Sequence, residues 1–376
     1  MARFHFAAPG EAQNVLLRCT TGYVQMLRHS TEVIASNAPV LIDAPDWYGD
    51  FVGAWSGIAT RARTWSDAIA PQISVIPQML ADFGTSYRAA FDAAQALLDR
   101  LAAQPNDTQA RAALKKEIDE LLRQAKANVP VVNSLRSQLG ELANHVGPDR
   151  ETLATAVASA ESSVRADLQQ INDISNRTSE LKTKIKDLEV KLGLMSFVAV
   201  DALVVMVGAT YLVTIAGGEA LYVTAGVAFT IIGAVGASLA TYKAIMLRQE
   251  ISDLQNQIAF DAAKMSRLNS QVLHLKVFDQ TVTDLVNVTA DSSSVMADVS
   301  AAWSVLAADT QALQADLENA EKDLDAGAIA GLRKDLQAGA DHWAQVQPLA
   351  AGLAAITVTV DSQPRSADGE PLSTSP

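Results

Sequence analysis

The chain has 376 residues, a formal net charge of −13 and one cysteine, Cys19. This acidic balance argues against a general binder of nucleic acid or anionic membranes, because such proteins carry an excess of basic surface. A single cysteine excludes an internal disulfide framework, so we expect Cys19 to be a small buried residue.

The N-terminal segment is predicted to begin without a cleavable leader and then to form a helix. The opening residues, MARFHFAAPGEAQN, lack a continuous apolar region followed by a small-residue cleavage site. A Sec signal peptide is therefore not predicted, and export would need another route. Apolar residues recur at helical spacing from Glu11 to about Ser36, which predicts the first helix.

Prolines and glycines between residues 38 and 54 predict an irregular connection, with a new helix starting near Asp50. Trp47, Tyr48 and Phe51 lie around this connection. We expect these aromatic side chains to pack against the helical bundle. Contact with a membrane or receptor is the alternative.

The next helices are also divided by breakers. A helix interrupted at Pro71 and Pro77 leads into a clean helical run from Gln78 to Ala103. Asp107 or Thr108 is expected to cap the following helix, because both residue types accept hydrogen bonds from free amides at a helix start.

That helix is predicted to extend toward His145, with a kink at Pro130 and a turn at Gly147-Pro148. From Asp149 to Gly193 no further breaker occurs, so a second long helix is expected.

Two stretches of heptad periodicity flank the middle of the chain. The first comprises Ile171, Ile174, Thr178, Leu181, Ile185, Leu188 and Leu192. The second comprises Leu247, Ile251, Leu254, Ile258, Met265, Leu268, Val272, Leu275, Val282 and Val286. Apolar residues at alternating spacings of three and four predict two long helices that pack along these stripes.

Between the two stripes lies an apolar block, from Leu192 to Leu247. It contains uncharged runs from Ala202 to Gly218 and from Ala220 to Tyr242. Each run is close to the ~20 apolar residues that cross a bilayer as a helix. The sequence therefore predicts a hydrophobic head over residues 194–246 that inserts into a membrane.

The head has two possible local structures. One is a helical hairpin that turns at Gly217, Gly218 and Glu219 and carries a ridge of small residues for close helix packing. The ridge consists of Gly226, Thr230, Ala234 and Ser238. The other is a short β-tongue, because β-branched and aromatic residues flank the Gly-Gly turn. The sequence leaves both possibilities open.

The predicted membrane-inserting residues are large apolar and aromatic side chains on both arms of the hairpin. They are Leu203, Val207, Tyr211, Leu212, Ile215, Leu221, Tyr222, Val227, Phe229, Ile231 and Ile232. Glu219 fits a turn that crosses the bilayer completely, or equally a polar loop in a soluble head. Lys191, Lys243 and Arg248 flank the block and are expected at the headgroups on the entry side.

Residues 1–193 and 247–360 are predicted to form the helical tail bundle that carries the head. The polar stretch from Asp291 to Ser294 is expected to loosen or end the helix that follows the head. A final pair of helices is predicted over Val295 to Ala326 and Leu332 to Ala355. The last residues, 361–376, are rich in Ser, Pro and charge and are expected to be disordered.

No motif in the chain indicates an enzyme. The five histidines are scattered, without a helical His pair or a cysteine partner for a metal. Phosphate-binding loops of the nucleotide-binding types and a nucleophile elbow are absent. No catalytic residue, metal or cofactor is predicted.

Two heptad helices that enclose a hydrophobic hairpin resemble the cytolysin A and haemolysin BL superfamily of α-pore-forming toxins. The resemblance implies an all-α fold, an elongated bundle of about five long helices with a head that is a helical hairpin or short β-tongue. It also implies a secreted, soluble monomer that inserts its head into a target membrane and forms an oligomer. Partner subunits are expected, because an almost wholly apolar hairpin provides little polar lining for a channel.

Two other functions fit the same pattern. A resident two-span membrane scaffold or sensor would carry the same hairpin, and basic residues beside both span ends favour that reading. A soluble helical adaptor with a buried hairpin needs no membrane. Purification of a monomer without detergent would exclude the resident membrane protein.

Overall fold

The structure is a computed structural model that describes residues 9–36, 38, 45–163, 168–195, 203–214, 220–231, 250, 253–254, 257–258, 261, 267–319, 326–354 and 357–363. The described chain forms two compact units. Unit 1 comprises residues 1–19, 73–137 and 293–354, and unit 2 comprises residues 20–72, 138–292 and 355–376.

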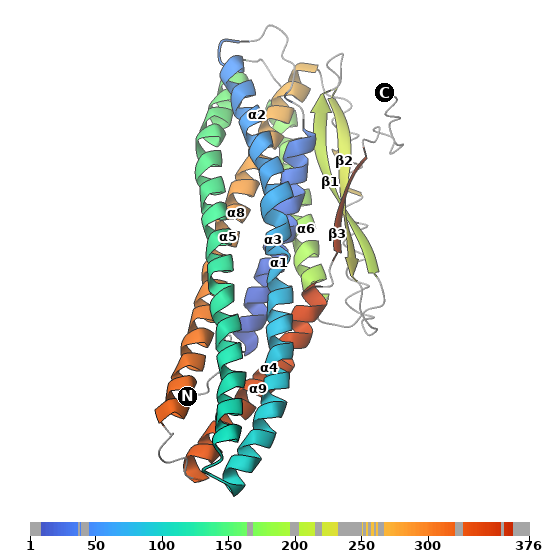
Figure 1. Cartoon of the computed structure of the whole chain (residues 1–376). Coiled ribbons are helices and arrows are strands. Elements are labelled where there is room, and N and C mark those ends of the chain that lie inside the picture. The colour runs from blue at the N-terminus through green and yellow to red at the C-terminus, as the bar shows by residue number, and fades with distance from the viewer. Residues whose placement is uncertain are drawn as a thin grey trace. The chain divides into compact units, whose positions relative to one another are not determined.

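Most described residues are helical (Figure 1). The helices are α1 (Pro9–Ala35), α2 (Tyr48–Thr64), the π-helix η1 (Trp65–Ile69), α3 (Ala70–Ile73), α4 (Ile76–Ala103), α5 (Thr108–Ser163), α6 (Leu168–Met195), α8 (Arg267–Asn319) and α9 (Ala326–Ala354). The strands are β1 (Leu203–Thr214), β2 (Ala220–Ile231) and β3 (Thr357–Gln363). The predicted helical bundle is confirmed, and the described residues of the predicted head, 203–214 and 220–231, form strands and not helices.

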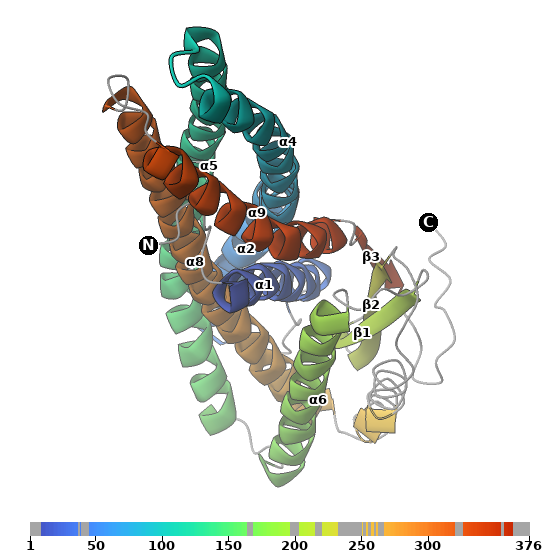
Figure 2. The same ribbon diagram turned by 90° about the horizontal axis from the view of Figure 1, so that it is seen from below.

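In unit 1, α4 and α9 lie side by side (Figure 2), and aromatic side chains form a core there. The ring of Phe83 lies 5.3 Å from that of Trp303 and 4.9 Å from that of Trp343, measured between centroids. Tyr87 donates its hydroxyl hydrogen to the backbone oxygen of Leu336 at 3.0 Å. Buried aromatic rings contribute much of the apolar area of a small core, so this cluster anchors the pair.

Close packing of α4 on α9 depends on Gly84. A Cβ atom at this position would lie 2.6 Å from Cβ of Gln347 and 3.2 Å from the ring of Trp343. Such distances are shorter than carbon atoms tolerate, so a larger residue would push the two helices apart.

The start of α5 is fixed by Asp107, one of the two predicted caps. Its carboxylate accepts hydrogen bonds from the amides of Gln109 and Ala110 at 3.0 and 2.9 Å. These bonds, led by that from Ala110, lower the pKa of Asp107. The cap satisfies amides that have no partner inside the helix.

Unit 2 is organised around the N-terminal part of α8. Residues 271–275 of this helix are all buried, which is typical of a helix surrounded by neighbours. The ring of Trp55 in α2 stacks on Phe278, with centroids 3.3 Å apart, and meets His274 edge to face. The predicted packing of the 38–54 aromatics is confirmed for Phe51, which is buried and contacts Trp55.

Unit 2 also contains a three-stranded antiparallel sheet in the order β1-β2-β3. Strands β1 and β2 pair along their full length, from Leu203 opposite Ile231 to Thr214 opposite Ala220. Strand β3 pairs with residues 224–230 of β2, from Thr224 opposite Gln363 to Thr230 opposite Thr357. Because β3 ends at Gln363, the expectation of disorder is wrong for residues 361–363, where backbone pairing with β2 overrides the polar composition.

Two expected breaks are also absent. Helix α5 runs through Gly147-Pro148, and α8 runs through the polar residues 291–294. In both places buried side chains continue on either side, with Val146 and Leu153 in α5 and Val288 and Val295 in α8. Tertiary packing of these apolar positions offsets the local cost of proline, glycine and polar residues.

Candidate functional site

The candidate functional site is the hairpin of β1 and β2, which we call the tongue. Each strand has 12 residues, and neither contains a charged residue. Gly208 and Gly226 are opposite each other near the middle of the hairpin. A strand of this length reaches across the hydrocarbon core of a bilayer when tilted.

Most of the predicted membrane-inserting residues belong to the tongue. Those in its strands are Leu203, Val207, Tyr211, Leu212, Leu221, Tyr222, Val227, Phe229 and Ile231. The register brings several of them opposite each other, including Leu203 with Ile231 and Val207 with Val227. Ile215 and Ile232 lie outside the described residues, as does the predicted turn at Gly217, Gly218 and Glu219.

The predicted helix-packing ridge is not formed in this state. Gly226 and Thr230 lie in β2, so they belong to a strand and not to a helix. The β-branched and aromatic residues around them favour extended backbone, and pairing with β1 and β3 stabilises it. Ala234 and Ser238 lie outside the described residues.

Helix α6 leads into the tongue, since it ends at Met195 and contacts β1. The heptad positions predicted to be buried in α6 are confirmed where the structure describes them. Ile171, Ile174, Thr178, Leu181 and Ile185 are all less than about a tenth exposed.

Ion pairs also tie α6 to the rest of unit 2. The Nζ atom of Lys182 lies 3.2 Å from the carboxylate of Asp284 in α8, and that of Lys184 lies 2.8 Å from Glu250. Lys184 also lies 3.9 Å from Glu180, as the four-residue spacing predicts. Because the Lys182 side chain is only 11% exposed, its pair with Asp284 is the best shielded from solvent of these contacts.

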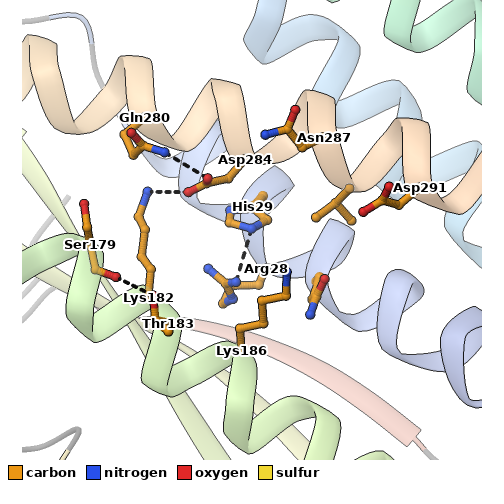
Figure 3. A pocket seen from close by; sticks show the side chains of 12 residues that line it. Arg28, His29, Ser179, Lys182, Thr183, Lys186, Gln280, Asp284, Asn287 and Asp291 are labelled. Carbon is orange, nitrogen blue, oxygen red and sulfur yellow. Dashed lines mark hydrogen bonds and ion pairs between the residues drawn. The ribbon is translucent and has the colours of Figure 1, made fainter.

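A buried charged cluster in α1 is a feature that sequence reasoning missed. Arg28, His29 and Glu32 are 2%, 3% and 3% exposed. Arg28 donates to Glu32 at 3.0 Å. The two ring nitrogens of His29 lie 3.3 Å from Glu32 and 3.1 Å from Arg28, and Figure 3 shows the second of these contacts. A spacing of four between Arg28 and Glu32 was the available signal, but it is equally common on exposed helix faces.

Electrostatics in this cluster favour a neutral histidine beside a charged pair. Burial and then the charge of Arg28 lower the pKa of His29 to about 4, against the opposing effect of Glu32. Burial acts to raise the pKa of Glu32, but the charge of Arg28 and the bond with His29 outweigh it and hold the pKa well below its usual range. A neutral His29 can accept from Arg28 and donate to Glu32, so both of its ring nitrogens are hydrogen-bonded.

Of the three basic residues predicted at the lipid headgroups, the structure describes only one. Lys191 lies near the C-terminal end of α6, one turn before Met195. Lys243 and Arg248 lie outside the described residues. Their role at a membrane surface stays a prediction.

Two further findings bear on the class of site. Within the described part of the chain, no group of acidic residues, histidines and cysteine is arranged to hold a metal ion. None of the helices in that part of the chain has the length and apolar character needed to span a membrane. Cys19 is buried as predicted, and burial raises the pKa of its thiol to about 12.

Comparison with known proteins gives a family match over part of the chain. Residues 55–187 match the model of the family described as Bacillus haemolytic enterotoxin (HBL). Comparison with curated protein sequences gives no match.

Several solved structures share the fold over nearly the whole chain. The HblL1 toxin component of Bacillus cereus is 15% identical, with a TM-score of 0.67 and coverage of 94% of this chain and 97% of that one. Soluble SmhA of the tripartite α-pore-forming toxin of Serratia marcescens is 12% identical, with a TM-score of 0.67 and coverage of 94% and 96%. Motility associated killing factor B of Vibrio cholerae is 14% identical, with a TM-score of 0.66 and coverage of 94% of both chains. The family match and the shared fold confirm the resemblance predicted from the sequence.

Proposed function

We propose that this chain, with its haemolysin BL family match and the fold of α-pore-forming toxin components, is one component of a multi-component α-pore-forming toxin. It would be released as a water-soluble monomer, insert its tongue into a target membrane and oligomerise there with partner subunits. The titles of the Smh and AhlB structures describe components of tripartite toxins, which supports the expectation of partners. No enzymatic step is required.

The observation that carries this proposal is the charge-free tongue. Alternate positions of a strand belong to opposite faces of its sheet. The odd-numbered positions of β1 and β2 are all apolar or aromatic, whereas the even-numbered positions also include glycines and threonines, and neither set carries a charge. A sheet with one face in water normally alternates polar and apolar residues. The tongue therefore has one strongly apolar face and no charge on either face, a composition that suits a segment that inserts into a membrane.

We expect the tongue to change its backbone structure when it inserts. A two-stranded hairpin in lipid leaves the outer amide and carbonyl groups of both strands unpaired, which is costly in hydrocarbon. Helices satisfy all of these groups within each segment. The uncharged runs at residues 202–218 and 220–242 are close to the ~20 residues that a spanning helix needs. Insertion would thus separate β2 from β3 and convert the head into a helical hairpin.

A reversible crosslink between β2 and β3 tests this proposal. Val227 and Val360 are opposite each other in the register, so cysteines at both positions in a Cys19→Ala background can form a disulfide. We expect the oxidised protein to leave dye-filled liposomes intact and the reduced protein to permeabilise them, alone or with the products of neighbouring genes. A matched control with Val227→Cys alone should be insensitive to reductant.

Two outcomes would contradict the proposal. Equal dye release by the oxidised and reduced forms would show that β2 and β3 need not separate. If neither the reduced protein nor the parent chain releases dye, alone or with the products of neighbouring genes, the proposal of a toxin component is wrong. Extraction from cells only with detergent would favour the resident membrane scaffold instead.

A further inference from the structure

A cavity of about 260 Å³ opens between α1, α6 and α8 in unit 2 (Figure 3). It lies near the lower end of the size range of small-molecule sites, which suits a compact ligand. Polar side chains from all three helices line it, among them Arg28 from α1, Lys182 and Lys186 from α6 and Asp284 from α8.

The charges in this cavity leave one cation without a counterion in the described chain. Arg28 is paired with Glu32, and Lys182 is paired with Asp284. Lys186 is exposed and forms no ion pair with the described residues, and its side chain extends toward Arg28 in Figure 3. Asp291 is the other carboxylate of the lining, and it is exposed and lies apart from Lys186 in the same view.

A buried hydrogen-bond donor also lines the cavity. Gln25 is only 6% exposed, and its Nε2 atom has no acceptor among the described residues. A buried amide without a partner costs free energy, so it favours a ligand that brings an acceptor. This observation is independent of the charge balance and points to the same kind of ligand.

We propose that this cavity binds a small oxyanion of the phosphate class. Phosphate oxygens would accept hydrogen bonds from Gln25 Nε2 and the Lys186 ammonium, with the guanidinium of Arg28 adding positive potential nearby. Because Gln25 belongs to α1 and Lys186 to α6, the ligand would tie these two helices together. Helix α6 leads directly into β1, so the bound anion would hold the root of the tongue in place. The ligand could be a free phosphate ion or the phosphate of a lipid headgroup.

The test uses the full-length protein and inorganic phosphate as the probe. Binding is measured by calorimetry against sodium chloride at matched ionic strength, and amide hydrogen exchange follows α6. We expect saturable binding to the parent chain, slower exchange in α6, and an affinity at least about 10-fold weaker in Lys186→Gln and Gln25→Met. Lys116→Gln removes an exposed lysine of α5 outside the cavity and should bind phosphate as the parent does.

Vesicles distinguish the two sources of phosphate. If phosphatidic acid in phosphatidylcholine vesicles retains the parent and Lys116→Gln but not Lys186→Gln, the ligand is a headgroup. If the three proteins bind these vesicles alike but Lys186→Gln binds free phosphate more weakly than the other two, the ligand is a free phosphate ion. Absence of phosphate-specific binding at about 10 mM, or equal affinity in all four proteins, would overturn the proposal. None of these readouts depends on lytic activity, so they are separable from the proposed toxin function.

Discussion

The two units of the chain bury their apolar residues in different ways. In unit 1, α4 and α9 each present an apolar stripe that meets the other around Phe83, Trp303 and Trp343. In unit 2, neither strand of the tongue carries a charge, and α1 contributes a buried charged cluster.

This difference indicates which unit is built to change. A helix with one apolar stripe buries that stripe against a single partner helix, so separating α4 from α9 would only expose apolar surface to water. An uncharged segment with a strongly apolar face can be buried against protein or in lipid, provided that its backbone is paired. We therefore expect mutations in unit 1 to act on stability and mutations in the tongue to act on membrane activity.

The largest expected effect is that of a charge in the tongue. Val207→Asp places a carboxylate in the middle of β1, opposite Val227. A charge near the bilayer centre costs roughly 2–4 kcal/mol per subunit, so we expect dye release from liposomes to fall by about 100-fold or more. Far-ultraviolet circular dichroism should still report a helical protein, since most of the bundle is unchanged.

The matched control is Val131→Asp, which makes the same substitution at a valine that is 45% exposed in α5. It should permeabilise liposomes like the parent. A folded Val207→Asp protein with full dye release would contradict the expectation that mutations in the tongue act on membrane activity.

The second effect concerns the aromatic core of unit 1. Trp343→Ala removes a ring that is 2% exposed and leaves Phe83 without one of its ring contacts. Loss of a large buried ring costs about 3–5 kcal/mol, measured as the free energy of unfolding in urea. Below its unfolding transition the variant should still release dye. Loss of activity in the folded variant would show that unit 1 takes part directly in insertion.

Much of the fold followed from patterns in the sequence. Apolar spacing predicted α1, α4 and the buried stripe of α6, and Asp107 marked the start of α5. These signals are local, because a helix face and a cap involve residues a few positions apart. The continuity of α5 at Pro148 and of α8 at Ser292 was missed, since it depends on packing against helices distant in sequence.

The sequence predicted which residues belong to the candidate site, but it did not predict how their backbone pairs. The uncharged runs identified the tongue, and the β-branched residues near Tyr211 and Val223 allowed strands there. Nothing local connected residues 357–363 with β2, because their pairing spans more than a hundred positions. The cluster of Arg28, His29 and Glu32 was missed for the same reason, since burial of α1 is a property of the assembled bundle.

A smaller effect is expected where α4 and α9 approach most closely. Gly84→Ala places a methyl group within 2.6 Å of Gln347 Cβ and should destabilise the protein by about 1–3 kcal/mol. Gly331→Ala in α9 is the matched control, because a Cβ there meets no atom within 4 Å. That change should be neutral or stabilise by up to about 1 kcal/mol. The same sign for both variants in urea unfolding would contradict the close-packing argument.

The last expected effect is a pH dependence of the free energy of unfolding that arises from a buried histidine of unit 2. Burial lowers the pKa of His29 to about 4 in the folded protein, whereas histidine in an unfolded chain titrates near 6.5. Between these values the unfolded chain takes up a proton that the folded one does not. The free energy of unfolding should therefore fall as the pH drops below about 6.5, by up to about 1.4 kcal/mol per pH unit from this residue.

The variant His29→Gln isolates this contribution. Its side-chain amide can still accept from Arg28 and donate to Glu32, but it does not titrate, so the bonds of the cluster are retained without the proton uptake. Urea unfolding at about pH 7 and pH 5 should show a weaker loss of stability in the variant than in the parent, with the two proteins most alike at the higher pH. Burial also lowers the pKa of His274 in α8 to about 4, so His274→Gln should reduce the same pH dependence independently. If neither substitution changes the slope, the acid response of unit 2 does not come from its buried histidines. If both do, the unit that carries the tongue loses stability on acidification through the buried histidines of α1 and α8.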